Sequence, residues 1–184
     1  MSRAARSISG TKCLGVMLLA ALAPYAAGAQ DASCKQVFNG IKLQAKTPNH
    51  QYFTISGAQP DSQALTNEVV HTGTARFDWV NGTWQSVPES PRDVLKREEQ
   101  NFKNSRAVCR LLRDEMVDGV ATAVYMEQSQ TGSISSVGTI WIAKNSGLPV
   151  HEQFNIDAGT GPAGQRRIDI RIVYKDVHAP VIVK

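Results

Sequence analysis

Residues 166–177 alternate between apolar and polar side chains, and this pattern constrains the possible fold more than any other feature of the sequence. Neighbouring side chains of a β-strand point to opposite faces of a sheet, so this strand has one apolar and one polar face. The pattern predicts an antiparallel sheet with one dry face and one face in water. The apolar positions are Ile168, Ile170, Ile172 and Tyr174, and the polar positions are Arg167, Asp169 and Arg171.

Eight earlier segments also have the composition of strands and are bounded by turn residues. Asn81-Gly82 separates two of them, and Asn-Gly in this setting is the strongest short signal for a β-hairpin. Asp118-Gly119 and Asn145-Ser146-Gly147 mark two further turns. The sequence therefore predicts one antiparallel sheet of seven to nine strands. The earlier strands are expected at residues 51–56, 65–72, 75–80, 83–87, 107–117, 119–128, 136–144 and 148–157.

Two segments have helical patterns. In residues 34–45 the apolar side chains recur at the spacing of one helix face, and Ser33 or Asp31 can cap the start. A second helix is expected from Pro91 to about Lys103, because a serine precedes a proline at the first helical position. The apolar stripe of this second helix is thin, so we expect it to be mostly exposed.

The two helices are small compared with the sheet. One strongly amphipathic helix cannot cover the whole apolar face of seven to nine strands. Either the sheet curls on itself, or part of its apolar face stays open to a ligand.

Residues 1–29 have the parts of a cleaved secretory signal peptide. Basic residues precede an apolar run at residues 13–23, which is too short to span a bilayer. Ala27-Gly28-Ala29 then supplies the small residues that signal peptidase accepts, so Gln30 should begin the mature chain. We expect a periplasmic protein in which residues 30–184 form one domain, with no lipid anchor and no transmembrane segment.

Signal cleavage also changes the charge and the cysteine content. Three basic residues leave, so 17 Lys and Arg remain against 16 Asp and Glu, and the mature chain is not basic enough to indicate a nucleic-acid partner. Cys34 and Cys109 remain after Cys13 is removed. An even pair in an oxidising compartment predicts a disulfide, which closes a loop of about 75 residues and contributes roughly 4 kcal/mol of stability.

Motifs for cofactors and catalysis are absent or lie in the wrong context. Residues 159–164 match G-x-G-x-x-G, but a strand rather than a helix follows, so we expect no nucleotide. The histidines lack metal-site spacing, and we expect neither a metal nor another cofactor. His71 with Asp78, or His151 with Glu152, could form an acid–base pair, but no recognisable nucleophile accompanies either pair. We therefore expect no catalytic residues.

The C-terminal third resembles a known family. Residues 141–150 read Trp-Ile-Ala-Lys-Asn-Ser-Gly-Leu-Pro-Val, and Tyr174-Lys175-Asp176-Val177 with Pro180 follows the last strand. This arrangement resembles the end of the LolA-like periplasmic carriers and their LppX-type relatives. The resemblance implies an α+β, mainly β fold, in which two helices cover the concave face of a strongly curved antiparallel sheet, or half-open barrel. It also implies an apolar cavity for acyl chains or lipid-like ligands.

The leading hypothesis is therefore a non-enzymatic binding or carrier protein for an apolar or lipid-like ligand. The alternative is a regulatory module that binds another envelope protein through the same sheet. A buried cavity favours the first and a flat apolar patch favours the second. The expected cavity is mainly apolar and measures a few hundred cubic ångströms. The residues expected to form the ligand site are Trp79, Val124, Met126, Trp141, Leu148, Val150, Ile168, Ile170, Ile172 and Tyr174.

Overall fold

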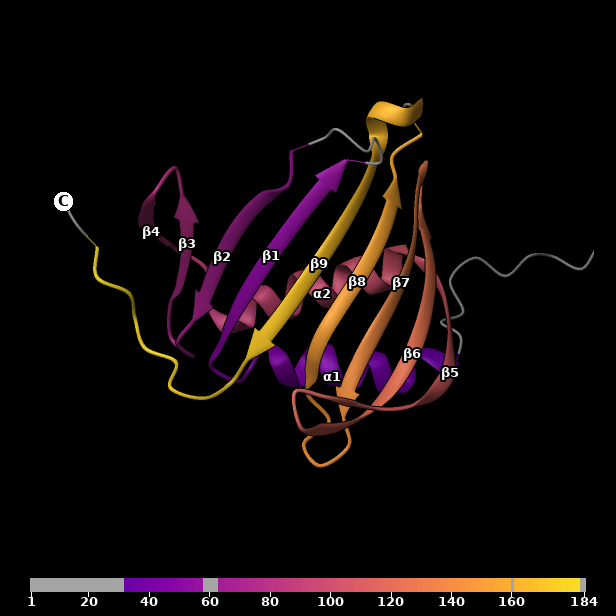
Figure 1. Cartoon of the computed structure of the whole chain (residues 1–184), viewed down its shortest axis with the longest axis horizontal. Helices are drawn as coiled ribbons and strands as arrows, with labels where there is room; N and C mark the ends of the chain where they lie inside the picture. The colour runs from indigo at the N-terminus through magenta and orange to yellow at the C-terminus, as the bar shows by residue number, and fades with distance from the viewer. Residues whose placement is uncertain (1–31, 58–62, 160, 183–184) are drawn as a thin grey trace, which may run out of the picture.

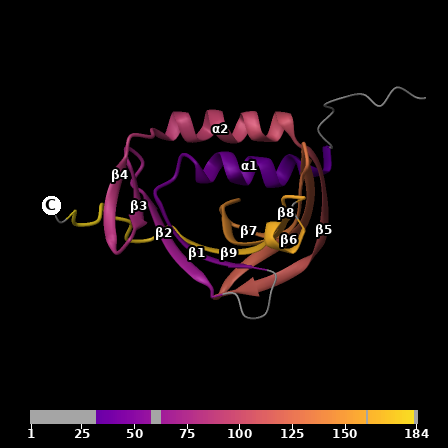
Figure 2. The same cartoon turned by 90° about the horizontal axis from the view of Figure 1, so that it is seen from above.

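The strands form one antiparallel sheet that is strongly curved but not closed (Figures 1 and 2). The computed structural model describes residues 32–57, 63–159 and 161–182, so the expected signal peptide lies outside the described residues. The strand order is β4-β3-β2-β1-β9-β8-β7-β6-β5, and the fold is α+β and mainly β, as predicted. The strands are β1 (Asn49–Gly57), β2 (Leu65–His71), β3 (Arg76–Val80), β4 (Thr83–Val87), β5 (Arg106–Val117), β6 (Val120–Thr131), β7 (Ile134–Ala143), β8 (Pro149–Asp157) and β9 (Gln165–Val173).

The strands lie close to the positions that the sequence predicts. Asn81 and Gly82 both have positive φ, 51° and 80°, which is the geometry of a tight hairpin turn between β3 and β4. β9 is shorter than expected, because it ends at Val173 rather than Val177. Asp176 adopts a φ of 53°, so the chain leaves the extended conformation before Val177.

The first helix, α1 (Lys35–Gln44), is fastened to the edge strand β5. It follows a 3₁₀ turn at Ala32–Cys34, and Cys34 is its N-cap without a side-chain cap hydrogen bond. Ser33 does not cap the helix; its Oγ accepts a hydrogen bond from the backbone N–H of Cys109 at 3.0 Å, and Asp31 lies outside the described residues. Cys34 and Cys109 form the predicted disulfide, with their Cα atoms 4.8 Å apart.

The second helix, α2 (Pro91–Asn104), lies beside α1 on the concave side of the sheet (Figure 2). Ser90 and Asp93 form a capping box at its start, in which each side chain bonds the backbone of the other. Phe102 stacks on Phe38 of α1 with ring centroids 4.1 Å apart. The two helices therefore cover the sheet as one layer.

The hydrophobic core lies under α1, toward the β5 edge. Gly40 allows α1 to approach the turn after β7, since a Cβ at this position would be 3.0 Å from the carbonyl oxygen of Gly147. The core cluster consists of Cys34, Val37, Ala107, Cys109, Ile140 and Ile142. This packing leaves the concave face of β1, β2 and β8 less completely filled.

The hairpin of β5 and β6 also covers part of the convex face. Asp118 at its tip forms a 3.2 Å ion pair with Arg171 of β9, and Arg171 lies directly across from His151 in β8. His151 in turn lies across from Trp141 in β7. The hairpin thus passes over these two side chains, which explains why Trp141 is buried on the outer face of the sheet.

Candidate ligand-binding cavity

A cavity of about 390 Å³ lies between the helices and the concave face of the sheet. Ile41 of α1 and Val94 of α2 form its roof, and Phe53 of β1 and Phe154 of β8 lie on the sheet side. A second cavity of about 300 Å³ shares Ile41, Glu98 and Glu127 with the first. The two cavities therefore adjoin beneath the helices.

Strand register explains which side chains reach the cavity. Four directly paired residues form one row across the sheet. In order, they are Phe53 of β1, Ile170 of β9, Glu152 of β8 and Ile140 of β7. Directly opposed residues in neighbouring strands share a face of the sheet. Since Phe53 and Glu152 line the cavity, this whole row belongs to the concave face.

The cavity is not mainly apolar, which corrects the prediction from the sequence. Nine of the fifteen residues that line it are polar or charged, so it can accept a ligand with a polar group as well as an apolar part. The polar residues are Gln44, Asn49, Gln51, His71, Arg76, Arg97, Glu98, Glu127 and Glu152. The apolar residues are Ile41, Ala45, Phe53, Val69, Val94 and Phe154.

The two arginines of the cavity wall are held by acidic neighbours. Arg76 bonds Asp78 through Nε at 2.7 Å and Glu89 through Nη1 at 2.7 Å. Arg97 pairs with Glu89 and, at 3.3 Å, with Glu98. The positive charges at this end of the cavity are therefore already compensated by the protein.

Two carboxyl groups of the sheet have no such cationic partner among the described residues. Glu152 is only 9% exposed, and burial raises the pKa of its carboxyl to about 7, with the negative charges of Glu127 and Glu98 adding to the shift. Burial also raises the pKa of Glu127, although a hydrogen bond from Ser129 opposes this shift. The carboxyls of Glu152 and Glu127 are thus the cavity groups whose negative charge no described cationic side chain compensates.

The acid–base pairs considered from the sequence do not form. Glu152 faces the cavity, whereas His151 faces the convex side and bonds Asp169 through Nε2 at 3.0 Å. Asp78 is bound to Arg76 instead of His71. Burial, together with the positive charge of Arg76, lowers the pKa of His71 to about 4, so its imidazole is neutral at neutral pH.

The residues predicted to bind ligand are divided between the two faces of the sheet. Ile168, Ile170 and Ile172 do lie on the concave face, across from Ile55, Phe53 and Gln51 of β1. Tyr174 follows β9, and its hydroxyl donates a hydrogen bond to the carbonyl of Pro149 at 2.6 Å. Leu148 and Val150 are half-buried at the start of β8.

The remaining four predicted residues lie on the convex face, so the ten do not form a single floor. Val124 of β6 lies across from Trp141, and Met126 is two positions further along the same face. Trp79 of β3 packs edge-on against Trp84 with ring centroids 5.3 Å apart. None of the ten predicted residues is among those that line the main cavity.

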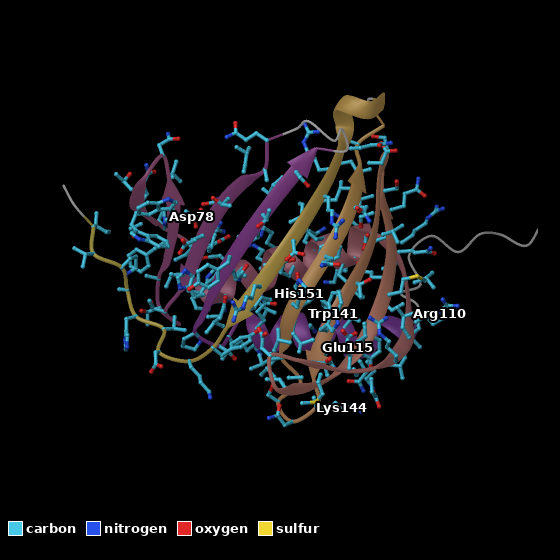
Figure 3. All side chains as sticks on the ribbon, in the orientation of Figure 1. Asp78, Arg110, Glu115, Trp141, Lys144 and His151 are labelled. Carbon is cyan, nitrogen blue, oxygen red and sulfur yellow. A yellow bond between two sulfur atoms is a disulfide. The ribbon has the colours of Figure 1, made fainter. Side chains whose placement is uncertain are left out.

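Trp141 belongs instead to a polar cluster on the convex face (Figure 3). Its ring stacks on His151 with centroids 4.5 Å apart, and its Nε1 donates a hydrogen bond to Glu115 at 3.3 Å. Glu115 also binds Arg113 at 2.6 Å. The partners within the cluster satisfy these polar groups and indicate a structural role.

Two glutamates on otherwise apolar strand faces are the sequence signal for this cavity, and they were not among the predicted site residues. Glu152 is in phase with Phe154 and Ile156 along β8, and Glu127 is in phase with Tyr125 along β6. A carboxylate on the otherwise apolar face of a strand is unusual, because burying an unpaired charge is costly. Both positions line the cavity, whereas the predicted aromatic residues Trp79, Trp141 and Tyr174 do not.

Residues 32–57, 63–159 and 161–182 contain no group of three or more His, Cys, Asp or Glu side chains arranged to hold a metal ion. Neither α1 nor α2 is long and apolar enough to cross a membrane, and no other helix of this part is.

No family model matches the chain, and no curated protein matches its sequence. Similar solved structures include LprF from Mycobacterium bovis, with a TM-score of 0.41, 12% identity and coverage of 85% of this chain and 98% of that one. The LolA superfamily protein NE2245 from Nitrosomonas europaea has a TM-score of 0.29 and 9% identity, over 83% of this chain and 98% of that one. MucB in complex with MucA(peri) has a TM-score of 0.41 and 11% identity, over 81% of this chain and 57% of that one.

Proposed function

We propose that this chain is an exported, non-enzymatic binding protein that holds a lipid-like ligand between its helices and the concave face of its sheet. The observation that carries this proposal is the cavity of about 390 Å³, which lies within the size range of small-ligand sites. The resemblance of the C-terminal residues to LolA-like carriers implies the same kind of site.

The lining favours an amphipathic ligand over a purely apolar one. Phe53, Phe154 and Val69 offer apolar contacts on the sheet side, and Ile41 and Val94 offer them on the helix side. Polar side chains lie between these contacts. A ligand with both an apolar chain and a polar group can satisfy both parts of the lining, whereas a hydrocarbon would leave buried polar groups unpaired.

Export to the periplasm is part of the proposal. It is supported by the signal-peptide features of residues 1–29 and by the Cys34–Cys109 disulfide, since disulfides persist mainly in oxidising compartments. Fractionation of the native cells should recover the protein outside the cytoplasm with Gln30 as its first residue. Recovery from the cytoplasm with residues 1–29 attached would contradict export.

Filling the cavity tests the binding function. Gln51 lines the cavity, whereas Thr54 on the same strand is exposed and belongs to the opposite face. Isothermal titration of the mature protein with decanol should give saturable binding that weakens roughly tenfold or more in Gln51→Trp and is unchanged in Thr54→Trp. Equal binding by all three proteins would place the ligand outside the cavity and contradict the proposal.

A second candidate function is suggested by the edge strand β5. Val108, Leu111 and Met116 on this strand are 51%, 56% and 62% exposed. An exposed apolar edge can pair with a strand of another protein. If an envelope protein binds there, Leu111→Ser should abolish that complex without affecting decanol binding, whereas Gln51→Trp should affect decanol binding alone.

A further inference from the structure

The carboxyl of Glu152 lies in the cavity wall without a partner. Glu152 lies in β8, directly across from Ile140 on one side and Ile170 on the other, and its side chain is 9% exposed. No residue in the described part of the chain donates a hydrogen bond to it or forms an ion pair with it. A carboxylate buried in this way is unfavourable unless it takes up a proton or a cation from outside the protein compensates its charge.

Two further carboxyls face the same space from other elements. Glu127 of β6 lines both adjoining cavities, and Glu98 of α2 does the same from the helix layer. Both increase the negative potential at Glu152. Gly138 of β7 lies across from Glu127 and has no side chain to separate the two sheet carboxyls, Glu127 and Glu152. The middle of the combined cavity is therefore lined by three acidic groups.

The nearby cations are used elsewhere. Arg76 is bound by Asp78 and Glu89, and Arg97 is shared between Glu89 and Glu98. Lys42 of α1 pairs with Glu99 at 3.3 Å and lies over the ring of Phe38. The negative charge of the two sheet carboxyls is thus left without compensation by the described cationic side chains.

We infer that the cavity binds a cationic amphiphile, with a protonated amine between Glu152 and Glu127 and an apolar chain against Phe53 and Phe154. This inference rests on the proposed function and names the chemical class of its ligand. A protonated amine brings both the hydrogen-bond donors and the positive charge that the site lacks. A fatty acid would instead add another negative charge to three carboxyls. An alcohol can donate one hydrogen bond but leaves the charge uncompensated.

Three ligands with the same chain test this inference: decylamine, decanol and decanoate, each titrated into the mature protein at neutral pH below its micelle concentration. A primary amine has a pKa near that of lysine, about 10.4, and is protonated under these conditions. Decylamine should bind roughly tenfold or more tightly than decanol, and decanoate should bind most weakly. The mature sequence has nearly balanced charges, so its net charge does not favour the amine.

Variants locate the charge that the amine recognises. Glu152→Gln keeps the shape of the side chain and should remove most of the preference for decylamine over decanol. The matched control is Glu68→Gln, which removes a carboxyl that bonds His50 and does not line the cavity. This control should keep the full preference. Retained decanol binding by Glu152→Gln also shows that the variant is folded.

The outcomes separate the inference from the proposed function. If decanol and decylamine bind equally, or if Glu152→Gln keeps the preference, the cavity binds amphiphiles but the inferred role of the carboxyl is wrong. If Glu68→Gln loses the preference as Glu152→Gln does, the amine binds at the surface and the inference is again wrong. If none of the three ligands binds at all, both the inference and the proposed function fail.

Discussion

The ring of Phe154 in β8 lies against Gly138 in β7, so closely that a Cβ at position 138 would be 2.2 Å from Cδ1 of Phe154. The same Cβ would be 3.0 Å from the carbonyl oxygen of Gln153. Glycine at this position therefore sets where the ring lies on the sheet side of the cavity. An added methyl group must displace either the ring or the backbone.

Gly138→Ala should accordingly lower the free energy of unfolding by about 1–3 kcal/mol, the usual cost of overpacking. It should also weaken decanol binding, because Phe154 lines the cavity. Urea unfolding and titration measure the two effects. Ser135→Ala, at an exposed position of the same strand, is the control and should change neither quantity. Unchanged stability in Gly138→Ala would contradict the close packing.

Removing the disulfide should destabilise the protein strongly. The bridge joins residues 75 apart in sequence, and both cysteines are buried in the core cluster. The double variant Cys34→Ala, Cys109→Ala should lose about 2–5 kcal/mol in urea unfolding. Free thiols in the folded, unreduced protein, or equal stability of the double variant, would contradict the bridge.

Glu152 should make stability depend on pH. The pKa of its carboxyl rises from 4.5 to about 7 on folding, so the folded state binds this proton more tightly than the unfolded state does. Its contribution to stability is therefore full at pH values below 4.5 and is lost as pH rises through about 7, a loss of roughly 3 kcal/mol. Glu127 and Glu98 support this shift, and Arg97, Arg76, His71 and Tyr174 are the other titratable groups near the site.

His71 acts in the opposite direction and must be separated from this effect. Its pKa falls from 6.5 to about 4 on folding, so its contribution to stability increases as pH rises across that range. The informative quantity is therefore the difference in unfolding free energy between Glu152→Gln and the unmodified protein. This difference should shift in favour of the variant between pH 4.5 and pH 8. A difference that does not change with pH would contradict the raised pKa of Glu152.

Trp79 should not contribute to ligand binding. It lies on the convex face, where it packs against Trp84. Trp79→Ala should lose about 0.5–1.5 kcal/mol for the aromatic contact, together with some buried area, while decanol affinity stays the same. Calorimetry of the variant measures both quantities. A large loss of decanol affinity in a folded Trp79→Ala protein would return the site to the convex face.

The fold was accessible from the sequence because its signals are local. Alternation places Ile168, Ile170 and Ile172 on one face whatever the neighbouring strand is, and the Asn81-Gly82 turn fixes the hairpin between β3 and β4. The capping box of Ser90 similarly marks the start of α2. The residues that make up each of these patterns lie within a few positions of one another in the chain.

The composition of the site was not accessible in the same way, because it depends on the register between strands. The pairing of β7 with β8 shifts between Trp141 and Ile142. Ile142 therefore lies across from Pro149, whereas a regular register would place it across from Val150. A second shift lies between Leu111 and Arg113 in β5. Such irregularities change which face a side chain shares with a distant strand. Trp141 itself lies opposite the cavity because it alternates along β7 with Ile140, which shares the concave row of Glu152.

Native mass spectrometry of the protein purified from its own envelope tests the central claim of a ligand-holding cavity most directly. The unmodified protein should appear as the mature chain beginning at Gln30, with an added mass that is released on collisional activation. Gln51→Trp should appear without the added mass, and Thr54→Trp should keep it. An unmodified protein that carries no added mass under gentle ionisation, or an added mass that Gln51→Trp retains, would contradict the claim.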